Sequence, residues 1–274
     1  MDQEKELKLV LFTDLDGTLL NSQSYSYEEA LPAIRWLRER QIPVIFCSAK
    51  TRAEQEAYRK ALGINDPFIV EEGSAILIPR GYFPFHLETR RWTDDYAVIE
   101  LGLPYEHIKV VLNRLKKEFR CEIKAFGDLL AEEIARDSGL SLQMARLAKQ
   151  REYTETLKLE GTVEEVKRFL QQVEGEGLHW SRGERYYRIK GRANKGEATR
   201  ILLGLFRKAF GQVKSIAIGN SLSDGPMLRV VDYPVLLKAP DGGWAPISLP
   251  KLYRFDGSGP TAWSKAIEVL VSQL

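Results

Sequence analysis

Two aspartates stand two residues apart near the start of the chain, in the segment Leu9–Leu20 that reads LVLFTDLDGTLL. Asp14 and Asp16 follow an apolar run that predicts a buried strand, and Gly17 permits a sharp turn after them. Because residues i and i+2 at a strand end point the same way, both carboxylates can enter one pocket. Phosphoryl transfer to a carboxylate needs such a pair, since one aspartate attacks phosphorus, the second handles the proton, and a cation lies beside both.

Two other interpretations of this pair are a solvated turn after a strand and a calcium-binding loop. A calcium loop needs a third carboxylate soon after the first two and a glutamate that closes it. Residues 17–27 contain no acidic side chain, so the sequence disfavours a calcium loop. We therefore interpret Asp14 and Asp16 as catalytic residues.

Length and composition set the class of protein. The chain has 274 residues, a length that is enough for one large domain or two of ordinary size. Its composition, 44% hydrophobic and 28% charged, is that of a soluble globular protein. A net charge of +2 gives no support for a nucleic-acid or membrane partner. Cys47 and Cys121 lie far apart without metal-type spacing, which is typical of a reducing compartment. With no signal peptide or membrane span recognised, we expect a cytoplasmic monomer or homodimer.

The order of predicted elements favours an α/β fold with a doubly wound, mostly parallel sheet that is interrupted by an α+β insert. Short apolar runs predict core strands at 8–13, 43–47, 68–70, 75–78, 215–218 and 234–237. Helical periodicity predicts core helices at 27–39, 52–62, 195–210, 224–231 and 261–274. The insert is predicted to hold helices at 105–119, 128–138, 142–150 and 163–173, and strands at 156–160 and 186–189. We therefore predict a Rossmann-like core of residues 1–84 and 191–274 and an inserted domain of residues 85–190.

Three further segments place polar side chains at predicted strand or helix ends. Ser48 follows the second strand, where its hydroxyl either donates to a phosphoryl oxygen or caps the next helix. Lys195 begins a helix, where the macrodipole disfavours a cation, so either an anion lies nearby or the lysine is solvated. Residues 219–225, GNSLSDG, follow another buried strand; their oxygens either complete a Mg²⁺ site with Asp14 or bind their own backbone.

These four pieces, in this order, resemble the haloacid dehalogenase superfamily of phosphatases, and the insert resembles that superfamily's type-B cap. The resemblance implies that Asp14 forms an aspartyl phosphate and that residues 85–190 are a cap that selects the substrate. It also implies a Mg²⁺ ion held by the Asp14 carboxylate and the Asp16 backbone carbonyl. Where the superfamily usually has aspartate this chain has Asn220, so the third ligand is either Asn220 or Asp224. Intact catalytic aspartates disfavour a non-catalytic binding protein.

Shorter stretches resemble the mannosyl-3-phosphoglycerate phosphatase family. They are CSAKTRAE at 47–54, EEGSAI at 71–76, GLSL at 139–142, AKQREYTE at 148–155 and GERYY at 183–187. The resemblance implies hydrolysis of mannosyl-3-phosphoglycerate to mannosylglycerate, a compatible solute, and phosphate. A glucosyl-3-phosphoglycerate or sucrose-phosphate phosphatase and a phosphomannomutase-like phosphotransferase are the alternatives.

That substrate carries a sugar, a phosphate and a carboxylate, and each group needs a partner. Ser48 and Lys195 are the candidates for the phosphoryl oxygens. Arg151 and Arg185 are candidates for the carboxylate or for hydroxyls, because arginine matches carboxylate geometry bidentately, and Glu155 is a candidate acceptor for sugar hydroxyls. The alternative for each of the last three is a solvated cap side chain.

Overall fold

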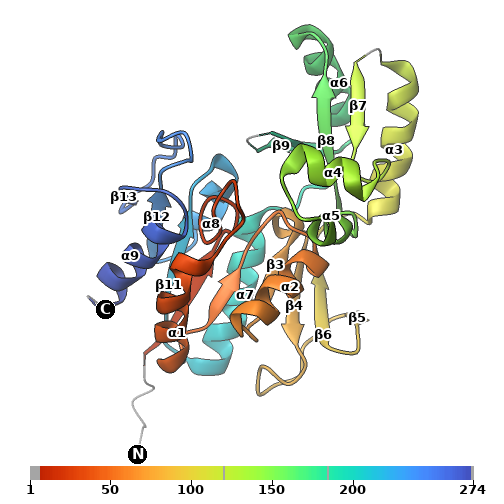
Figure 1. The fold of residues 1–274 in the computed structure, drawn as a ribbon. Helices are drawn as coiled ribbons and strands as arrows, with labels where there is room; N and C mark the ends of the chain where they lie inside the picture. The colour runs from red at the N-terminus through yellow and green to blue at the C-terminus, as the bar shows by residue number, and fades with distance from the viewer. Residues whose placement is uncertain (1–6, 120, 184, 273–274) are drawn as a thin grey trace, which may run out of the picture.

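The computed structural model describes residues 7–119, 121–183 and 185–272. Figure 1 shows two parts, with a core in the lower half and a smaller cap above it. The predicted α/β class is confirmed, with a parallel sheet in the core and antiparallel sheets beside it. No helix within the described residues is both long and apolar enough to cross a lipid bilayer.

The core sheet is parallel and has the order β13-β12-β11-β1-β2. Its strands are β1 (Lys8–Thr13), β2 (Val44–Phe46), β11 (Val213–Gly219), β12 (Tyr233–Leu237) and β13 (Tyr253–Phe255). The apolar residues of β1 alternate between two hydrophobic cores, with Leu11 in one and Phe12 in the other. A strand buried on both faces reads as a continuous apolar run, which is why β1 was recognisable.

Helices cover both faces of this sheet. They are η1 (Glu28–Ala30), α1 (Leu31–Glu39), α2 (Arg52–Leu62), α7 (Lys195–Phe210), η3 (Leu222–Asp224), α8 (Gly225–Leu228) and α9 (Gly259–Val271). Helix α2 keeps its predicted bounds because its ends carry local signals. Thr51 and Glu54 form a capping box at its start, and Gly63, with φ 64°, ends it.

A second, antiparallel sheet extends the core with the order β3-β4-β6-β5. It is made of β3 (Phe68–Val70), β4 (Ala75–Pro79), β5 (Arg91–Trp92) and β6 (Tyr96–Glu100), with the short turn η2 (Glu71–Gly73) after β3. A turn this short forces β4 to run antiparallel to β3, since a parallel return needs a crossover of about a dozen residues. Strand β3 connects to the parallel sheet through a bridge between Cys47 and Ile69.

The cap is a four-stranded antiparallel sheet of order β7-β8-β10-β9 with helices packed on it. Its elements are α3 (Tyr105–Glu118), β7 (Glu122–Ala125), α4 (Ala131–Ser138), α5 (Leu142–Ala148), β8 (Thr154–Glu160), α6 (Val163–Gly175), β9 (His179–Arg182) and β10 (Tyr187–Lys190). Leu112, Leu157 and Phe169 are among the apolar side chains of its own core. Helix α5 lies over α2, which brings the cap onto the carboxyl ends of the core strands (Figure 1).

Candidate active site

Asp14 follows β1, and its carboxylate lies in a buried contact with Lys195. Nζ of Lys195 is 2.6 Å from Oδ1 of Asp14 and 2.7 Å from Oδ1 of Asp224. Burial, together with the neighbouring Asp224 carboxylate, raises the pKa of Asp14 to about 7. Burial alone would lower the pKa of Lys195, but the two carboxylates raise it well above its ordinary value. One charged ammonium is therefore shared between two carboxylates.

Asp224 also fixes the loop that carries Asn220. Its Oδ2 accepts hydrogen bonds from the backbone N–H groups of Asn220 and Ser221, at 3.0 and 2.9 Å, and from the Ser221 hydroxyl at 2.9 Å. Gly219 allows this close approach, because a Cβ atom there would lie 2.5 Å from the Asp224 side chain. Both oxygens of Asp224 therefore have protein partners, and this carboxylate ties the start of α7 to the loop after β11.

The turn after Asp14 packs directly against Asn220. A Cβ atom on Gly17, whose φ is 70°, would lie 2.4 Å from Nδ2 of Asn220, so the contact requires glycine. The turn and Asn220 carry carboxylate, amide and main-chain carbonyl oxygens, the donor types that Mg²⁺ prefers. In the described part of the chain, no group of three or more His, Cys, Asp or Glu could hold a metal. Mg²⁺ commonly uses one or two carboxylates with water and substrate phosphate, so these donors fit it.

Asp16 forms an ion pair with Lys50, a residue that was not predicted to belong to the site. Nζ of Lys50 is 3.0 Å from Oδ1 of Asp16 and 3.4 Å from Oε1 of Glu54. The Lys50 side chain is 5% exposed, whereas that of Asp16 is 38% exposed. Burial alone would lower the pKa of Lys50, but the carboxylates of Asp16 and Glu54 raise it, so Lys50 stays charged.

Ser48 follows β2 at the same edge of the core sheet. It is buried, its N–H donates to the Ile69 carbonyl at 3.2 Å, and its Oγ accepts from the Lys50 N–H at 3.3 Å. The N-cap of α2 is Thr51, so Ser48 does not cap that helix. A hydroxyl that accepts from the backbone still has its own proton to donate to a ligand oxygen.

Two buried glutamates, Glu71 and Glu72, connect the end of β3 to the cap. Both have positive φ, 47° and 63°, which is rare for residues other than glycine. Glu71 accepts hydrogen bonds from the N–H groups of residues 152–154, at 2.8, 3.1 and 2.8 Å. Glu72 faces Lys190 at 3.5 Å and Arg188 at 3.8 Å, both on β10. Each glutamate thus holds a different strand at the base of the cap.

Arg151 lies at the junction of cap and core. It donates to Thr154 Oγ1 at 2.6 Å and to the Ala49 carbonyl at 3.4 Å, and it lies 3.7 Å from the Glu71 carboxylate. Its side chain is buried. These partners come from the second core strand's end, from η2 and from β8, so Arg151 joins three segments.

Glu155 and Arg185 have their partners within the cap. Glu155 accepts from the Tyr105 hydroxyl at 2.7 Å and from the Gly127 N–H at 3.2 Å, and burial raises its pKa. Arg185 donates to the Ser138 carbonyl at 3.1 Å. The same carbonyl accepts the Tyr25 hydroxyl from the core at 3.0 Å. Arg185 is exposed, so it keeps donors for a ligand, whereas Glu155 is buried.

The predicted residues therefore fall into two groups. Those at the carboxyl ends of the core strands are Asp14, Asp16, Ser48, Lys195, Asn220 and Asp224, and those of the cap and its junction are Arg151, Glu155 and Arg185. Four further residues of the site region were not predicted, and they are Tyr25, Lys50, Glu71 and Glu72. Lys50 lies in the segment after β2, and Glu71 and Glu72 come directly after β3. Ligands collect at strand ends in open α/β sheets, so this position could have marked the three residues as candidates for the site.

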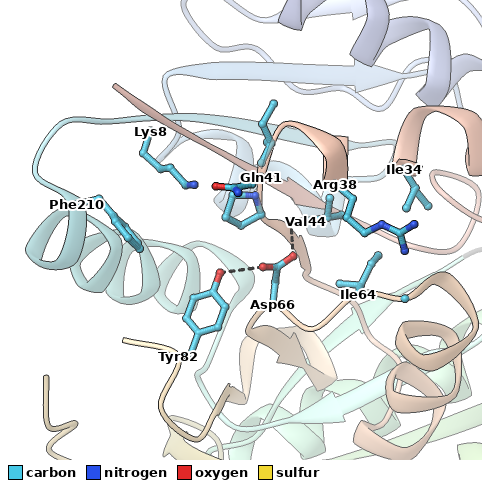
Figure 2. A pocket seen from close by; sticks show the side chains of 12 residues that line it. Lys8, Ile34, Arg38, Gln41, Val44, Ile64, Asp66, Tyr82 and Phe210 are labelled. Carbon is cyan, nitrogen blue, oxygen red and sulfur yellow. Dashed lines mark hydrogen bonds between the residues drawn. The ribbon is translucent and has the colours of Figure 1, made fainter. Parts of the chain in front are cut away.

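A separate cavity of about 200 Å³ lies at the opposite end of the core (Figure 2). Lys8, which starts β1, lines it, whereas Asp14 follows the other end of the same strand. The one acid among the described residues that line the cavity, Asp66, accepts from the Val44 N–H at 2.9 Å and from the Tyr82 hydroxyl at 2.8 Å. Both Asp66 oxygens therefore serve the fold, and the paired aspartates lie elsewhere.

A buried aspartate after β1, a lysine that it shares with Asp224 and a cap over both form the arrangement expected of a hydrolase of the haloacid dehalogenase type. The chain belongs to the family of haloacid dehalogenase-like hydrolases, which it matches over residues 11–239. It has the fold of a haloacid dehalogenase-like hydrolase from Bacteroides thetaiotaomicron, with a TM-score of 0.67 at 14% identity over 97% of this chain and 100% of that one.

Within that family, the finer resemblance found in the motifs is confirmed. The chain is 42% identical to the glucosyl-3-phosphoglycerate/mannosyl-3-phosphoglycerate phosphatase of Methanococcoides burtonii, over 97% of this chain and 98% of that protein. It is 41% identical to the mannosyl-3-phosphoglycerate phosphatase of Pyrococcus horikoshii, over 81% of this chain and 88% of that protein.

Proposed function

We propose that the chain is a Mg²⁺-dependent phosphatase that hydrolyses mannosyl-3-phosphoglycerate to mannosylglycerate and phosphate through an aspartyl phosphate. The observation that carries the proposal is the buried contact of Asp14 with Lys195 at 2.6 Å, two residues before a second, partly exposed aspartate. The substrate comes from the relatives, which share about two fifths of the sequence and are named for it. We place the enzyme in the cytoplasm, as a monomer or homodimer without nucleic-acid or membrane partners.

The chemistry takes two displacements at phosphorus. A carboxylate oxygen of Asp14 attacks phosphorus, and the bond between phosphorus and the glycerate oxygen breaks. Its electron pair goes to that oxygen, which takes a proton from Asp16. A water oxygen then attacks the same phosphorus and gives its proton to Asp16, and the P–O bond to Asp14 breaks, which restores the carboxylate. Lys195 and the Ser48 hydroxyl bind the phosphoryl oxygens as charge develops on them.

The donors that would hold Mg²⁺ are the Asp14 carboxylate, the Asp16 main-chain carbonyl and Asn220. The ion supplies charge neutralisation between the nucleophile and the phosphoryl group when it is bound. Asp224 serves better as a support than as a ligand, because three donors and Lys195 already occupy its two oxygens. Asn220 then takes the position of the superfamily's usual aspartate at the cost of one negative charge.

The cap binds the remainder of the substrate in this proposal. Arg185 is exposed and keeps free guanidinium donors for the glycerate carboxylate or a sugar hydroxyl. Arg151 and Glu155 act by holding the cap in place, since buried internal partners surround both. Because β5 and β6 pair with β4 of the core, we propose that the chain enters the cap after β6 and leaves it after β10.

Phosphate release over a panel of sugar phosphates tests the proposal. We expect rapid release from mannosyl-3-phosphoglycerate, with chelation of Mg²⁺ abolishing it and added Mg²⁺ restoring it. Oxygen from labelled water should appear in the free phosphate, because the intermediate is hydrolysed. Transfer of the phosphoryl group to a sugar, without label in phosphate, would instead identify a phosphotransferase.

Glucosyl-3-phosphoglycerate is the second candidate substrate, favoured by a specific observation. The Methanococcoides burtonii relative is named for both the glucosyl and the mannosyl compound. The two sugars differ only in the configuration at one carbon, so one cap can accept both. Comparable kcat/KM values for the two substrates, with a far lower value for sucrose phosphate, would establish a dual enzyme.

A further inference from the structure

The segment Ala49–Thr51, directly after Ser48, is one of the places where the core contacts the cap. The Thr51 hydroxyl donates to the Leu147 carbonyl of α5 at 3.0 Å. Arg151 reaches the Ala49 carbonyl at 3.4 Å. Ala49 and Thr51, the residues on either side of Lys50, are therefore both hydrogen-bonded to the cap, Thr51 to helix α5 and Ala49 to the segment that follows it.

Lys50 itself turns the other way, toward the carboxylate of Asp16. Its ammonium lies 3.0 Å from Oδ1 of Asp16 and 5.0 Å from the centre of the Tyr25 ring, with the Tyr58 ring at 5.7 Å. Glu54, the second carboxylate beside it, is held by the Thr51 N–H at 2.9 Å. A charged lysine enclosed by two carboxylates and two aromatic faces has one orientation, so it can fix what it touches.

Tyr25 carries a second connection from Lys50 to the cap. Its ring faces the Lys50 ammonium, and its hydroxyl donates to the Ser138 carbonyl at the end of α4. Arg185 donates to that same carbonyl. Tyr25 also holds a positive φ of 56°, a conformation that costs free energy for a tyrosine and persists only where surrounding contacts impose it.

Asp16 presents one oxygen to Lys50 and the other side to the open site. Oδ1 is buried, yet the side chain as a whole is 38% exposed, so the exposed surface lies on the remainder of the side chain, which includes Oδ2. The Lys50 ammonium, the ion-pair partner 3.0 Å from Oδ1, offers no acceptor to a proton on that oxygen, and its positive charge disfavours a proton there. The exchangeable proton of Asp16 is thereby confined to Oδ2.

We propose that Lys50 is a positioning residue that aims Oδ2 of Asp16 at the leaving-group oxygen when the cap is docked on Ala49–Thr51 and Tyr25. This inference rests on the acid–base role proposed above for Asp16. It assigns to Lys50 no contact with the substrate. Its function is to make proton transfer depend on the cap, so that a substrate that closes the cap also completes the acid–base group.

The test uses Lys50→Met, which keeps the length and apolar stem of the side chain but removes its charge. With mannosyl-3-phosphoglycerate, whose leaving group needs a proton, we expect kcat to fall about 100-fold. With p-nitrophenyl phosphate, whose leaving group needs none, we expect a burst of one nitrophenolate per enzyme and then a slow phase, because only hydrolysis of the aspartyl phosphate still needs Asp16. Lys50→Arg, which restores the charge, should recover most of the loss and remove the burst.

Two comparisons separate positioning from a loss of structure. Lys60→Met removes an exposed lysine from helix α2, which begins just after Lys50, and should behave as the unmodified enzyme. A purely structural effect of Lys50→Met would slow both steps alike and give no burst, which would overturn the proposal. If Lys50→Met does not fold, Tyr25→Phe provides the test, because it removes only the hydrogen bond to the Ser138 carbonyl. A fall in kcat on mannosyl-3-phosphoglycerate, smaller than the roughly 100-fold expected for Lys50→Met, supports the proposal. An unchanged kcat overturns it.

The failure of this inference is distinguishable from failure of the proposed function. An inactive Asp14→Asn variant together with a Lys50→Met enzyme of normal kcat would overturn the role of Lys50 alone. Turnover by Asp14→Asn would overturn the mechanism on which both proposals depend.

Discussion

The ammonium of Lys195 lies 2.7 Å from the Asp224 carboxylate, and both side chains are buried. Lys195 begins α7, where the helix macrodipole opposes a positive charge, so its position needs compensation by anions. Asp224 supplies one of them and at the same time accepts three hydrogen bonds from the loop after β11. This ion pair therefore fixes Lys195 at Asp14 and fixes the Asn220 loop against the same site.

Replacing Asp224 with alanine should destabilise the protein and inactivate it. A buried lysine that loses one of its two carboxylates costs about 3–5 kcal/mol, and the loop also loses its acceptor. Chemical denaturation should show that loss in the free energy of unfolding. The matched control is Asp94→Ala, at an exposed position before β6, which should change the free energy of unfolding by less than about 0.5 kcal/mol. Equal stability of the two variants would contradict the role of Asp224.

Replacing Asp14 with asparagine should abolish turnover while the protein stays folded. The amide is nearly isosteric with the carboxylate but is a poor nucleophile, so no aspartyl phosphate can form. Labelling of the protein by a substrate with a radioactive phosphoryl group measures the first step, and phosphate release measures the second. Ordinary turnover in this variant would remove Asp14 as the nucleophile.

The core was predictable because its signals are local. The apolar run of β1, the capping box of α2 and the asparagine N-cap of α7 each mark an element from within a few residues. Strands β5, β6, β7, β9 and β13 were not predicted. In β5 and β13, two or three half-exposed residues at a sheet edge carry no apolar run. The order of helices and strands, together with the paired aspartates, was sufficient for the fold class.

The contacts between cap and core could not be predicted in this way. Glu71 binds Thr154, which is 83 residues further along the chain, and both partners are polar residues without any periodic pattern. Its positive φ depends on the surrounding packing and is not encoded by a glycine. Lys50 lies within the stretch CSAKTRAE but was not predicted as a residue of the site, because nothing in a sequence shows that its side chain turns toward Asp16.

Replacing Arg185 with alanine should raise KM for mannosyl-3-phosphoglycerate much more than KM for p-nitrophenyl phosphate. The loss of one charge-assisted hydrogen bond to the substrate's carboxylate or sugar is worth about 1.5–3 kcal/mol, or roughly a tenfold to hundredfold rise. Arg182→Ala, which removes another exposed arginine of the cap, is the matched control. An equal rise in KM for both substrates would show that Arg185 does not bind the substrate's remote groups.

Replacing Asn220 with aspartate should strengthen Mg²⁺ binding. The change restores the negative charge that the superfamily usually has at this position, and charge count is a principal determinant of affinity at oxygen sites. We expect the apparent Kd for Mg²⁺, measured by calorimetry, to fall about tenfold. Ser223→Asn, which alters the same loop without adding charge, serves as the control. An unchanged Kd in Asn220→Asp would indicate that Asn220 is not a ligand.

Mg²⁺ affinity should depend on pH through Asp14. Burial and the Asp224 carboxylate raise the pKa of Asp14 to about 7 in the metal-free protein, so Asp14 is increasingly protonated as the pH falls below that value. Only the carboxylate binds the ion, so the apparent Kd should rise about tenfold per pH unit below pH 7 and level off above it. Calorimetry in two buffers of different ionisation enthalpy should detect release of a proton on the acid side. An affinity that stays constant from about pH 5.5 to 8 would exclude Asp14 as the titrating ligand.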